Sequence, residues 1–315
     1  MISLERIAEK PWIWSFIAAG IVWSATIIFT GGQGGGGLLS AALTFGTFFV
    51  IVGIGQMFVI TLGPGNVDLS IPATITLAGS VAMKVMDTQD SLIIVGLVVA
   101  LACGLAVGTF NYTLIRLLRI PPIIATLSSS FIVQSAAIAY GRGLRIKPPP
   151  MLADFTTALI GGIPLVAVVV GLITVVMGLL LHRTVYGRSV LAIGQNSRAA
   201  DLAGIRVERI RFATYVGCAL LAALCGYLFS GFSGGSSLSM GEQYLLASIA
   251  VVVIGGTSVV GGNGNLPGLW GASLFLFLVQ SMLNTYQLSA GWRFVATGLI
   301  IIAVITAAGR REAST

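Results

Sequence analysis

Long apolar runs follow one another along almost the whole chain, separated by short segments that contain glycine, proline or charged residues. An α-helix needs about 20 apolar residues to cross a bilayer. Of the 315 residues, 56% are apolar and 9% are charged, whereas roughly 25% are charged in soluble domains. The sequence therefore predicts an all-α integral membrane protein, and we expect residues 1–315 to form a single transmembrane domain.

The apolar runs predict about ten transmembrane helices. We place them at residues 12–29, 38–62, 69–86, 92–115, 121–140, 160–182, 211–230, 244–259, 266–284 and 292–308. The first run follows Arg6 and Lys10, as a signal peptide would, but it is long enough to span and no small-residue cleavage pattern follows it. We therefore interpret it as a retained first helix.

The positions of the basic residues indicate how the chain is oriented. With an even number of spans, both termini lie on the same side of the membrane. If that side is the cytoplasm, the inner segments hold twelve of the 17 lysines and arginines. Cytoplasmic loops carry an excess of Lys and Arg, so we expect both termini to be cytoplasmic. The net charge of +7 then reflects the excess of basic residues in cytoplasmic segments and does not indicate binding to nucleic acid.

Several chemical functions lack the residues that they require. The sequence contains no HExxH, no G-x-S-x-G and no Gly-Lys-Ser/Thr motif, so we expect neither a catalytic site nor a P-loop ATPase. The one histidine, His182, has no nearby cysteine or acidic partner, so we expect no metal site and no cofactor. All ten acidic residues lie in termini, loops or span edges, which argues against a proton-coupled carrier.

Neutral polar residues do occur inside the predicted spans. They include Gln56, Asn111, Ser128 to Ser130, Gln134, Gln280 and Asn284. Such side chains form hydrogen bonds between helices or line a pathway, and the sequence leaves both roles open. A pathway lined by uncharged hydrogen-bonding groups would suit a neutral polyhydroxyl solute better than an ion.

A break rich in glycine and proline separates the second and third spans and contains Asn66, Asp68 and Ser70. Asp68 or Ser70 could cap the helix that begins near Pro72. Alternatively, the break forms a gating turn that faces the substrate, because irregular backbone at membrane depth survives only where it is buried in protein or lines a cavity.

The longest expected inner loop, residues 182–211, contains the pattern of a short helix between spans six and seven. Asn196 or Ser197 can serve as its N-cap and Gly204 as the residue that follows its end. These signals frame a helix of about two turns.

Ala199 and Ala203 share one face of this helix, with Leu202 beside them. So short a helix is marginal in water unless it docks on something. One interpretation is a basic loop that only fixes topology. The other is a cytoplasmic coupling helix that inserts its small-residue face into a groove of an ATPase.

Three stretches carry a resemblance to a known family. Residues 194–205 match the pattern G-x-N-x-x-A-A-x-x-x-G-I in full, and residues 241–264 and 120–127 are also typical of that family. On these motifs, the chain resembles the ribose-type permeases of ATP-binding cassette (ABC) importers. The family's Asp-Leu-Ser core is present at 68–70 with changed flanks, which leaves the transported sugar open.

The resemblance implies a permease subunit in the bacterial cytoplasmic (inner) membrane that carries a small neutral sugar, such as a pentose, a hexose or a related polyol. The implied partners are membrane lipid, a second permease subunit, cytoplasmic ABC subunits that bind the ATP, and an extracytoplasmic solute-binding protein. The implied ATPase-coupling residues are Gly194, Asn196, Arg198, Ala199, Ala200, Asp201, Ala203 and Gly204. The candidate residues of the translocation path or gate are Asn66, Asp68, Ser70, Gln134, Gly255, Gly256 and Thr257.

The expected outer loop after the fifth span carries Arg142, Arg145 and Lys147 before three prolines. This basic segment either docks on an acidic rim of the binding protein or is a solvated loop without a partner. For the whole chain, two further functions stay open. One is a stand-alone facilitator or carrier for a neutral solute, and the other is an ABC permease for branched-chain amino acids or nucleosides.

Overall fold

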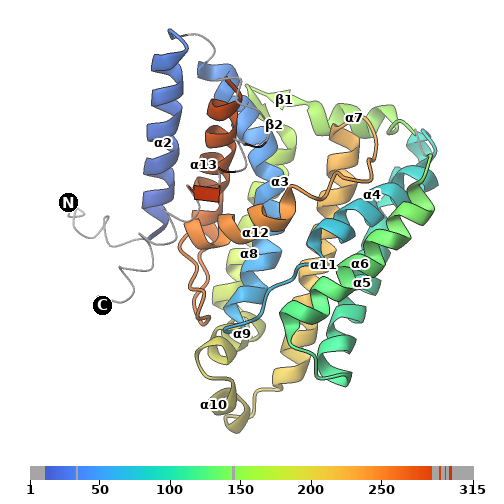
Figure 1. Ribbon diagram of the computed structural model, residues 1–315, viewed down its shortest axis with the longest axis vertical. Coiled ribbons are helices and arrows are strands. Elements are labelled where there is room, and N and C mark those ends of the chain that lie inside the picture. The colour runs from blue at the N-terminus through green and yellow to red at the C-terminus, as the bar shows by residue number, and fades with distance from the viewer. Residues whose placement is uncertain are drawn as a thin grey trace.

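The computed structural model describes residues 11–32, 35–143 and 146–285, together with residues 291, 295, 298 and 299. These residues are almost entirely helical, as the apolar runs predict (Figure 1). The helices are α2 (Pro11–Phe29), α3 (Gly35–Thr61), α4 (Ile71–Met86), α5 (Ile93–Leu117), α6 (Pro122–Gly141), α7 (Pro150–Thr157), α8 (Leu165–Arg183), α9 (Val185–Gln195), α10 (Ser197–Leu202), α11 (Val207–Phe232), α12 (Tyr244–Ile254) and α13 (Leu266–Thr285). A 3₁₀ turn, η1 (Asp90–Leu92), and an antiparallel hairpin of β1 (Leu159–Ile160) and β2 (Ile163–Pro164) complete the described elements.

Seven helical segments of the described chain are long and apolar enough to cross a membrane. They comprise α2, α3, α5 with η1, α6, α8, α11 and α13. The helices α4 and α12 are apolar but shorter, with 16 and 11 residues. The last predicted span, residues 292–308, lies almost wholly outside the described residues. The expected class of integral membrane protein is confirmed, and the number of ten spans stays a prediction.

The expected inner loop 182–211 contains more helix than the sequence indicates. Besides α10, it contains the helix α9, which the sequence analysis did not predict. Thr184 caps α9, because its Oγ1 atom accepts a hydrogen bond of 3.1 Å from the backbone N–H of Gly187. Val190 and Ile193 of α9 are buried, so packing against the helix bundle stabilises this segment.

Two expected spans are shorter than predicted. The span expected at 160–182 begins at Leu165, because the hairpin β1–β2 occupies the residues before it. The span expected at 244–259 ends at Ile254, where two glycines follow and Gly256 takes a φ of 85°. The small helix α7 was not predicted.

The helix α11 packs against α3, α4 and α5. Glycines allow several of these close contacts. A Cβ atom at Gly104 of α5 would lie 2.7 Å from the carbonyl oxygen of Ala219. A Cβ atom at Gly226 of α11 would overlap the carbonyl oxygen of Ile75 in α4. Small residues that let helix backbones approach closely are typical of packing between membrane helices.

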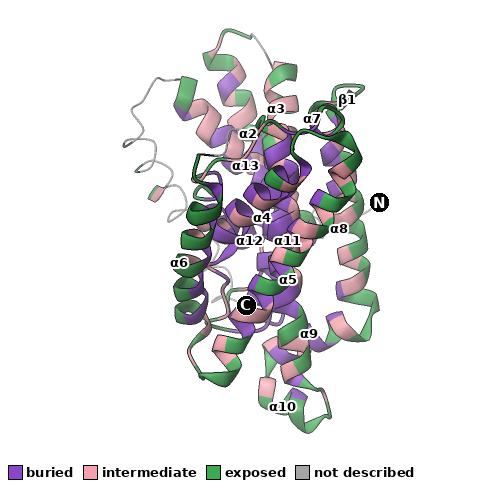
Figure 2. Cartoon of the chain, turned by 90° about the vertical axis from the view of Figure 1, so that its right-hand side faces the viewer, coloured by how far each residue is buried: buried purple, intermediate pink, exposed green. Residues whose placement is uncertain are grey.

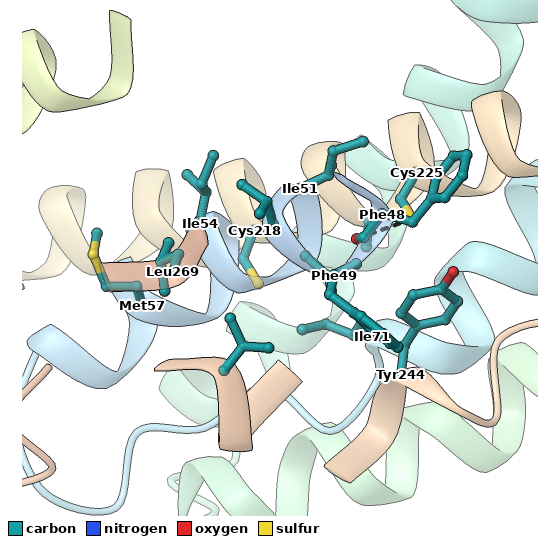
Figure 3. Close-up of a cluster of buried hydrophobic side chains, with 14 of the residues drawn as sticks. Phe48, Phe49, Ile51, Ile54, Met57, Ile71, Cys218, Cys225, Tyr244 and Leu269 are labelled. Atoms are coloured by element: carbon teal, nitrogen blue, oxygen red, sulfur yellow. Dashed lines mark hydrogen bonds between the residues drawn. The ribbon is translucent and has the colours of Figure 1, made fainter. Parts of the chain in front are cut away.

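The core lies around α3, whose residues 46–61 are all buried. Phe49 of α3 packs against Tyr244 of α12, with ring centroids 5.3 Å apart. Figure 3 shows this contact and places the free thiols of Cys218 and Cys225 beside α3. The Cys225 Sγ atom lies 3.7 Å from the carbonyl oxygen of Phe48 (Figure 3).

The helices α9 and α10 project at one end of the molecule, and α7 lies with β1 and β2 at the opposite end (Figure 1). We call these the α10 end and the α7 end. The helix α2 packs along α13 at one flank. The outer faces of α6 and α8 are exposed (Figure 2) and carry apolar side chains such as Phe131 and Leu172. Such faces suit a lipid environment.

Candidate functional site

The helix α10 is the short helix that the sequence predicts in the inner loop. The Oδ1 atom of Asn196 accepts hydrogen bonds from the backbone N–H groups of Arg198 (3.1 Å) and Ala199 (3.0 Å). Gly204 follows the helix with a φ of 85°, a conformation that costs glycine little. The predicted N-cap and the predicted end of this helix are confirmed, and its contact with an ATPase stays a prediction.

One face of α10 points away from the rest of the chain. Within residues 197–203, the exposed residues are Arg198, Ala199, Asp201, Leu202 and Ala203. Leu202 keeps 83% of its surface exposed, whereas Ala200 is buried on the opposite side. Figure 2 shows α10 at the tip of the molecule. This face is therefore open to a partner.

Gly194, near the end of α9, lies at a junction of three backbone segments. A Cβ atom here would overlap the carbonyl oxygen of Thr61 at the end of α3 and the amide nitrogen of Gly262 before α13. The Gly262 N–H also donates a hydrogen bond of 2.9 Å to the Thr61 carbonyl oxygen. Position 194 therefore has no room for a side chain, and the junction holds α9 against α3.

Glu208 links α5 and α10 to the start of α11. Its carboxylate forms an ion pair with Arg116 of α5 and accepts a hydrogen bond of 2.7 Å from the Tyr112 hydroxyl. The Arg211 guanidinium lies 3.6 Å from the Glu208 carboxylate and donates a hydrogen bond of 3.2 Å to Ser197 Oγ of α10. We call these five residues the Glu208 cluster. The sequence analysis did not predict this cluster. Only Glu208 and Arg211 lie close enough on one helix for a sequence pattern to pair them, and the other members come from different helices.

Asp68 is the centre of a second cluster, in the connection between α3 and α4. It is 1% exposed, and its Oδ1 atom accepts hydrogen bonds from the backbone N–H (2.9 Å) and the hydroxyl (2.6 Å) of Ser70. Asn111 of α5 donates a hydrogen bond of 2.7 Å to Ser70 Oγ. The Oε1 atom of Gln56 in α3 accepts a hydrogen bond of 3.1 Å from the Asp68 N–H. We call these four residues the Asp68 cluster.

Asn66 lies beside this cluster and accepts a hydrogen bond of 3.1 Å from the hydroxyl of Tyr215 in α11. Ser70 is in the N-cap position of α4 but makes no side-chain cap bond. The predicted capping role is therefore wrong, because the Asp68 carboxylate binds Ser70 itself and the Ser70 hydroxyl donates back to it. The alternative role of this segment in a gate stays a prediction.

Asp68 lies in a connection, as expected, but the sequence did not reveal that it is buried. Within the described residues, Asp68 Oδ2, Gln56 Nε2 and Asn111 Oδ1 are buried without a hydrogen-bond partner. The cluster thus contains buried hydrogen-bonding atoms that have no partner within the described residues.

The other predicted path residues lie elsewhere in the fold. Gln134 of α6 donates a hydrogen bond of 2.8 Å to the carbonyl oxygen of Leu238. Residues 255–257 form the turn that ends α12, where Thr257 is 3% exposed and its Oγ1 accepts a hydrogen bond of 3.1 Å from the Asn265 N–H. The predicted set therefore divides among three places.

Two of the three basic residues predicted to dock the binding protein, Arg142 and Lys147, are exposed, and Arg145 lies outside the described residues. Lys147 lines a hollow of about 830 Å³. No group of three or more His, Cys, Asp or Glu residues in the described ranges is placed to hold a metal ion.

Comparison with known proteins identifies relatives of the chain. A family model described as the permease component of a branched-chain amino acid transport system matches residues 38–305. The probable ABC transporter permease protein y4mJ of Sinorhizobium fredii is 30% identical over 263 residues, covering 82% of this chain and 78% of that protein. The autoinducer 2 import system permease protein LsrC of an Enterobacter species is 30% identical over 284 residues, covering 87% of this chain and 82% of that protein.

The ribose import permease protein RbsC of Escherichia coli is 28% identical over 272 residues, covering 83% of this chain and 82% of that protein. No solved structure matches the chain. The family match extends over most of the sequence and includes all three stretches that carry the resemblance to ribose-type ABC permeases. That resemblance is thereby confirmed, and the chain belongs to the family of transport-system permeases that the matching model describes.

Proposed function

We propose that this chain is the transmembrane permease subunit of an ATP-driven importer that carries a small neutral sugar or a related polyol across the bacterial inner membrane. The observation that carries the proposal is that Ala199, Leu202 and Ala203 are exposed on α10 and just after it, within the family-typical motif at 194–205. Nothing in the described chain covers this face. A groove on a cytoplasmic ATPase would cover it, as in other helix-in-groove contacts.

The proposed substrate class is supported by the relatives and by the polar groups of the chain. Two relatives are named for the import of ribose and of autoinducer 2. The Asp68 cluster and Gln134 offer amide and hydroxyl groups, which suit the hydroxyl groups of a sugar. The description of the family model keeps a branched-chain amino acid permease as the second candidate.

The orientation that we propose puts the α10 end in the cytoplasm and the α7 end outside. Six arginines between residues 183 and 211 lie in α9, α10 and their flanks and support this orientation. The seven long helices, α4, α12 and residues 292–308 would together make ten spans of one transmembrane domain, with both termini cytoplasmic. The connections before α4 and α12 would extend these two short helices to the full thickness of the membrane.

The chain would act with several partners. ATP would bind to and be hydrolysed by separate cassette subunits that contact α10, so this chain itself would bind no ATP. A second permease subunit would complete the pathway. An extracytoplasmic binding protein would deliver the sugar at the α7 end, where Arg142 and Lys147 are exposed.

The contacts of α10 suggest how ATP hydrolysis would drive transport. Movement of α10 would reach α11 and α5 through the Glu208 cluster, in which Arg211 binds both Ser197 and Glu208. The helix α11 packs closely on α4, so these helices would move together between inward-open and outward-open states. A partner shifts such an equilibrium only if it binds the two states with different affinity.

The test is uptake of labelled monosaccharides into right-side-out vesicles that contain this chain with its candidate ATPase and binding protein. Accumulation of one sugar that requires internal ATP is the expected result. Equilibration that is independent of ATP would instead identify a facilitator. ATP-dependent accumulation of leucine and of none of the sugars would identify an amino acid permease.

A further inference from the structure

The hollow that Lys147 lines lies among the end of α11, the segment before α7 and the connection to α12. Its lining residues include Lys147, Phe229, Ser236, Ser237, Ser239 and Glu242. The volume of about 830 Å³ is within the range of small-molecule sites. The wall is mostly made by residues 233–243, which form turns and no helix.

This non-helical segment reaches deep into the molecule. Figure 1 shows α12 near the middle of the molecule, below the upper end of α11. Gln134 of α6 holds the segment by its hydrogen bond to Leu238, and a Cβ atom at Gly241 would overlap the carbonyl oxygen of Pro72 at the start of α4. The segment then ends at Tyr244, which packs beside Phe49 in the core (Figure 3).

Backbone without helical hydrogen bonds is tolerated at membrane depth only where protein buries it or where it lines a cavity. In transporters, breaks between helices near the middle of the membrane form sites for substrates, and this segment leads from the α7 end of the molecule toward Tyr244 in the core. The position of residues 233–243 therefore favours a ligand site over a passive linker.

The side chains of the hollow are available to a ligand. Within the described residues, the hydroxyls of Ser236, Ser237 and Ser239 make no side-chain hydrogen bond, and Lys147 and Glu242 take part in no ion pair. One ammonium and one carboxylate leave the wall without net charge. The wall thus offers hydrogen-bond donors and acceptors to a neutral ligand that has many hydroxyl groups.

Phe229 adds an apolar surface to this polar wall. A sugar ring has hydroxyl groups at its edge and C–H groups on its faces, so it can use both kinds of surface at once. A branched-chain amino acid would place a bulky apolar side chain against the serines and would leave their hydroxyls without partners.

We propose that this hollow is a low-affinity subsite for a monosaccharide at the outer end of the permease, with Ser237, Ser239 and Glu242 as hydrogen-bonding partners. The inference rests on the proposed function, because it assumes that the α7 end faces the side from which the sugar arrives. It adds a place where the solute binds after it leaves the binding protein.

The first experiment measures how a sugar protects a cysteine in the hollow. Ser237→Cys puts a reactive thiol at an exposed position of the wall, whereas the native Cys218 and Cys225 are buried and Cys103 is half-buried. Thr157→Cys at the end of α7 is the matched control, because Thr157 is exposed and does not line the hollow. A charged methanethiosulfonate that does not cross membranes would label both variants in right-side-out vesicles of the assembled transporter, with the unsubstituted chain as the background.

D-ribose, D-xylose, D-glucose, D-galactose and, separately, L-leucine are added at about 50 mM, which saturates a site with a millimolar Kd. A sugar at twice its Kd leaves about one third of the sites free, and only free sites react with the reagent. At least one aldose should therefore slow labelling of Ser237→Cys about threefold or more. Labelling of Thr157→Cys should not change. Equal labelling of Ser237→Cys with and without every aldose, or protection by leucine alone, would overturn the proposal.

A further labelling experiment adds the binding protein without sugar. If it protects Ser237→Cys fully while no free aldose does, the hollow is a docking surface for protein and the subsite proposal is wrong. ATP-dependent uptake in the same vesicles separates the two proposals. Uptake without protection overturns only the subsite, and absence of ATP-dependent uptake overturns only the importer.

A second variant tests the carboxylate. Glu242→Gln keeps the size of the side chain but removes the charge that strengthens a hydrogen bond to a sugar hydroxyl. The aldose concentration for half-protection of Ser237→Cys should rise about tenfold. Asp154→Asn in α7 is the control, because Asp154 is an exposed carboxylate outside the hollow. An equal effect of both variants would show that surface charge, and not contact with the sugar, determines the protection.

Discussion

Arg211 of α11 donates a hydrogen bond of 3.2 Å to the hydroxyl of Ser197, the first residue of α10, from a position 14 residues later in the chain. The same guanidinium lies 3.6 Å from Glu208, which is paired with Arg116 of α5. The start of α10 is therefore joined by side chains to two of the long helices. A partner that moves α10 has a defined route into the helix bundle.

Arg211→Gln tests that route. We expect ATP-driven uptake to fall about fivefold or more, within the usual range of coupling between two sites. ATP hydrolysis by the assembled transporter should continue, because the exposed face of α10 is unchanged. Half-exposed ion pairs contribute at most about 1 kcal/mol, so the free energy of unfolding should change little. Uptake, ATP hydrolysis and thermal unfolding of one reconstituted preparation give these three quantities.

Arg209→Gln is the matched control for this variant. Arg209 is exposed two residues earlier on the same helix and takes part in no ion pair among the described residues. It should transport like the unsubstituted chain. If both variants lose uptake to the same extent, the charge of the loop is responsible and the contact with Ser197 is not.

The double variant Ala199→Asp/Ala203→Asp should abolish ATP-driven uptake. It places two carboxylates on the exposed face of α10, where burial in an apolar groove would cost several kcal/mol. The protein should still insert and unfold normally, since neither side chain is buried in this chain. Ala199→Ser/Ala203→Ser keeps the side chains small and should retain most uptake. Normal uptake by the aspartate variant would show that α10 is not the contact with the ATPase.

Gly226→Ala should lower the stability of the helix bundle. Its new methyl group would overlap the carbonyl oxygen of Ile75 and separate α11 from α4, at a cost of about 1–3 kcal/mol. Gly217→Ala on the same helix meets no atom within 4 Å and should leave stability unchanged or slightly raised. Thermal unfolding of both variants in detergent compares them directly, and equal midpoints would contradict the close packing of α11 on α4.

Asp68→Ala should destabilise the α3–α4 connection. It removes the acceptor of the Ser70 N–H and hydroxyl inside the protein, and each buried group left unpaired costs about 1–3 kcal/mol. Asp154→Ala removes a carboxylate from the exposed surface of α7 and should have almost no effect on the unfolding temperature. Similar unfolding temperatures of the two variants would mean that water satisfies Ser70 when Asp68 is absent.

The sequence predicted those features that depend on local signals. The helix α10 was predicted with its cap because Asn196 and Gly204 act within a few residues. The helix α9 was missed because Gly187 and Gly194 lower its helix propensity. Its stability comes from tertiary packing of Val190 and Ile193, which no local pattern reports.

The candidate site shows the same division. Asp68 was placed correctly in a connection, but its burial depends on how α3, α5 and α11 pack around that connection. The pairing of Glu208 with Tyr112 joins residues 96 positions apart, so only the folded chain reveals it. The sequence analysis named residues 241–264 as family-typical but did not predict how far the break at residues 233–243 reaches into the molecule, because composition does not report the depth of a loop.

The junction at Gly194 has one more consequence. The end of α9 is held between the carbonyl oxygen of Thr61 and the amide of Gly262, with no side chain to yield between them. This contact opposes sliding of α9 along its axis. If a partner displaced α10, we would therefore expect the chain to turn about Gln195 and Asn196, which join α9 to α10, and to carry the displacement toward the start of α11.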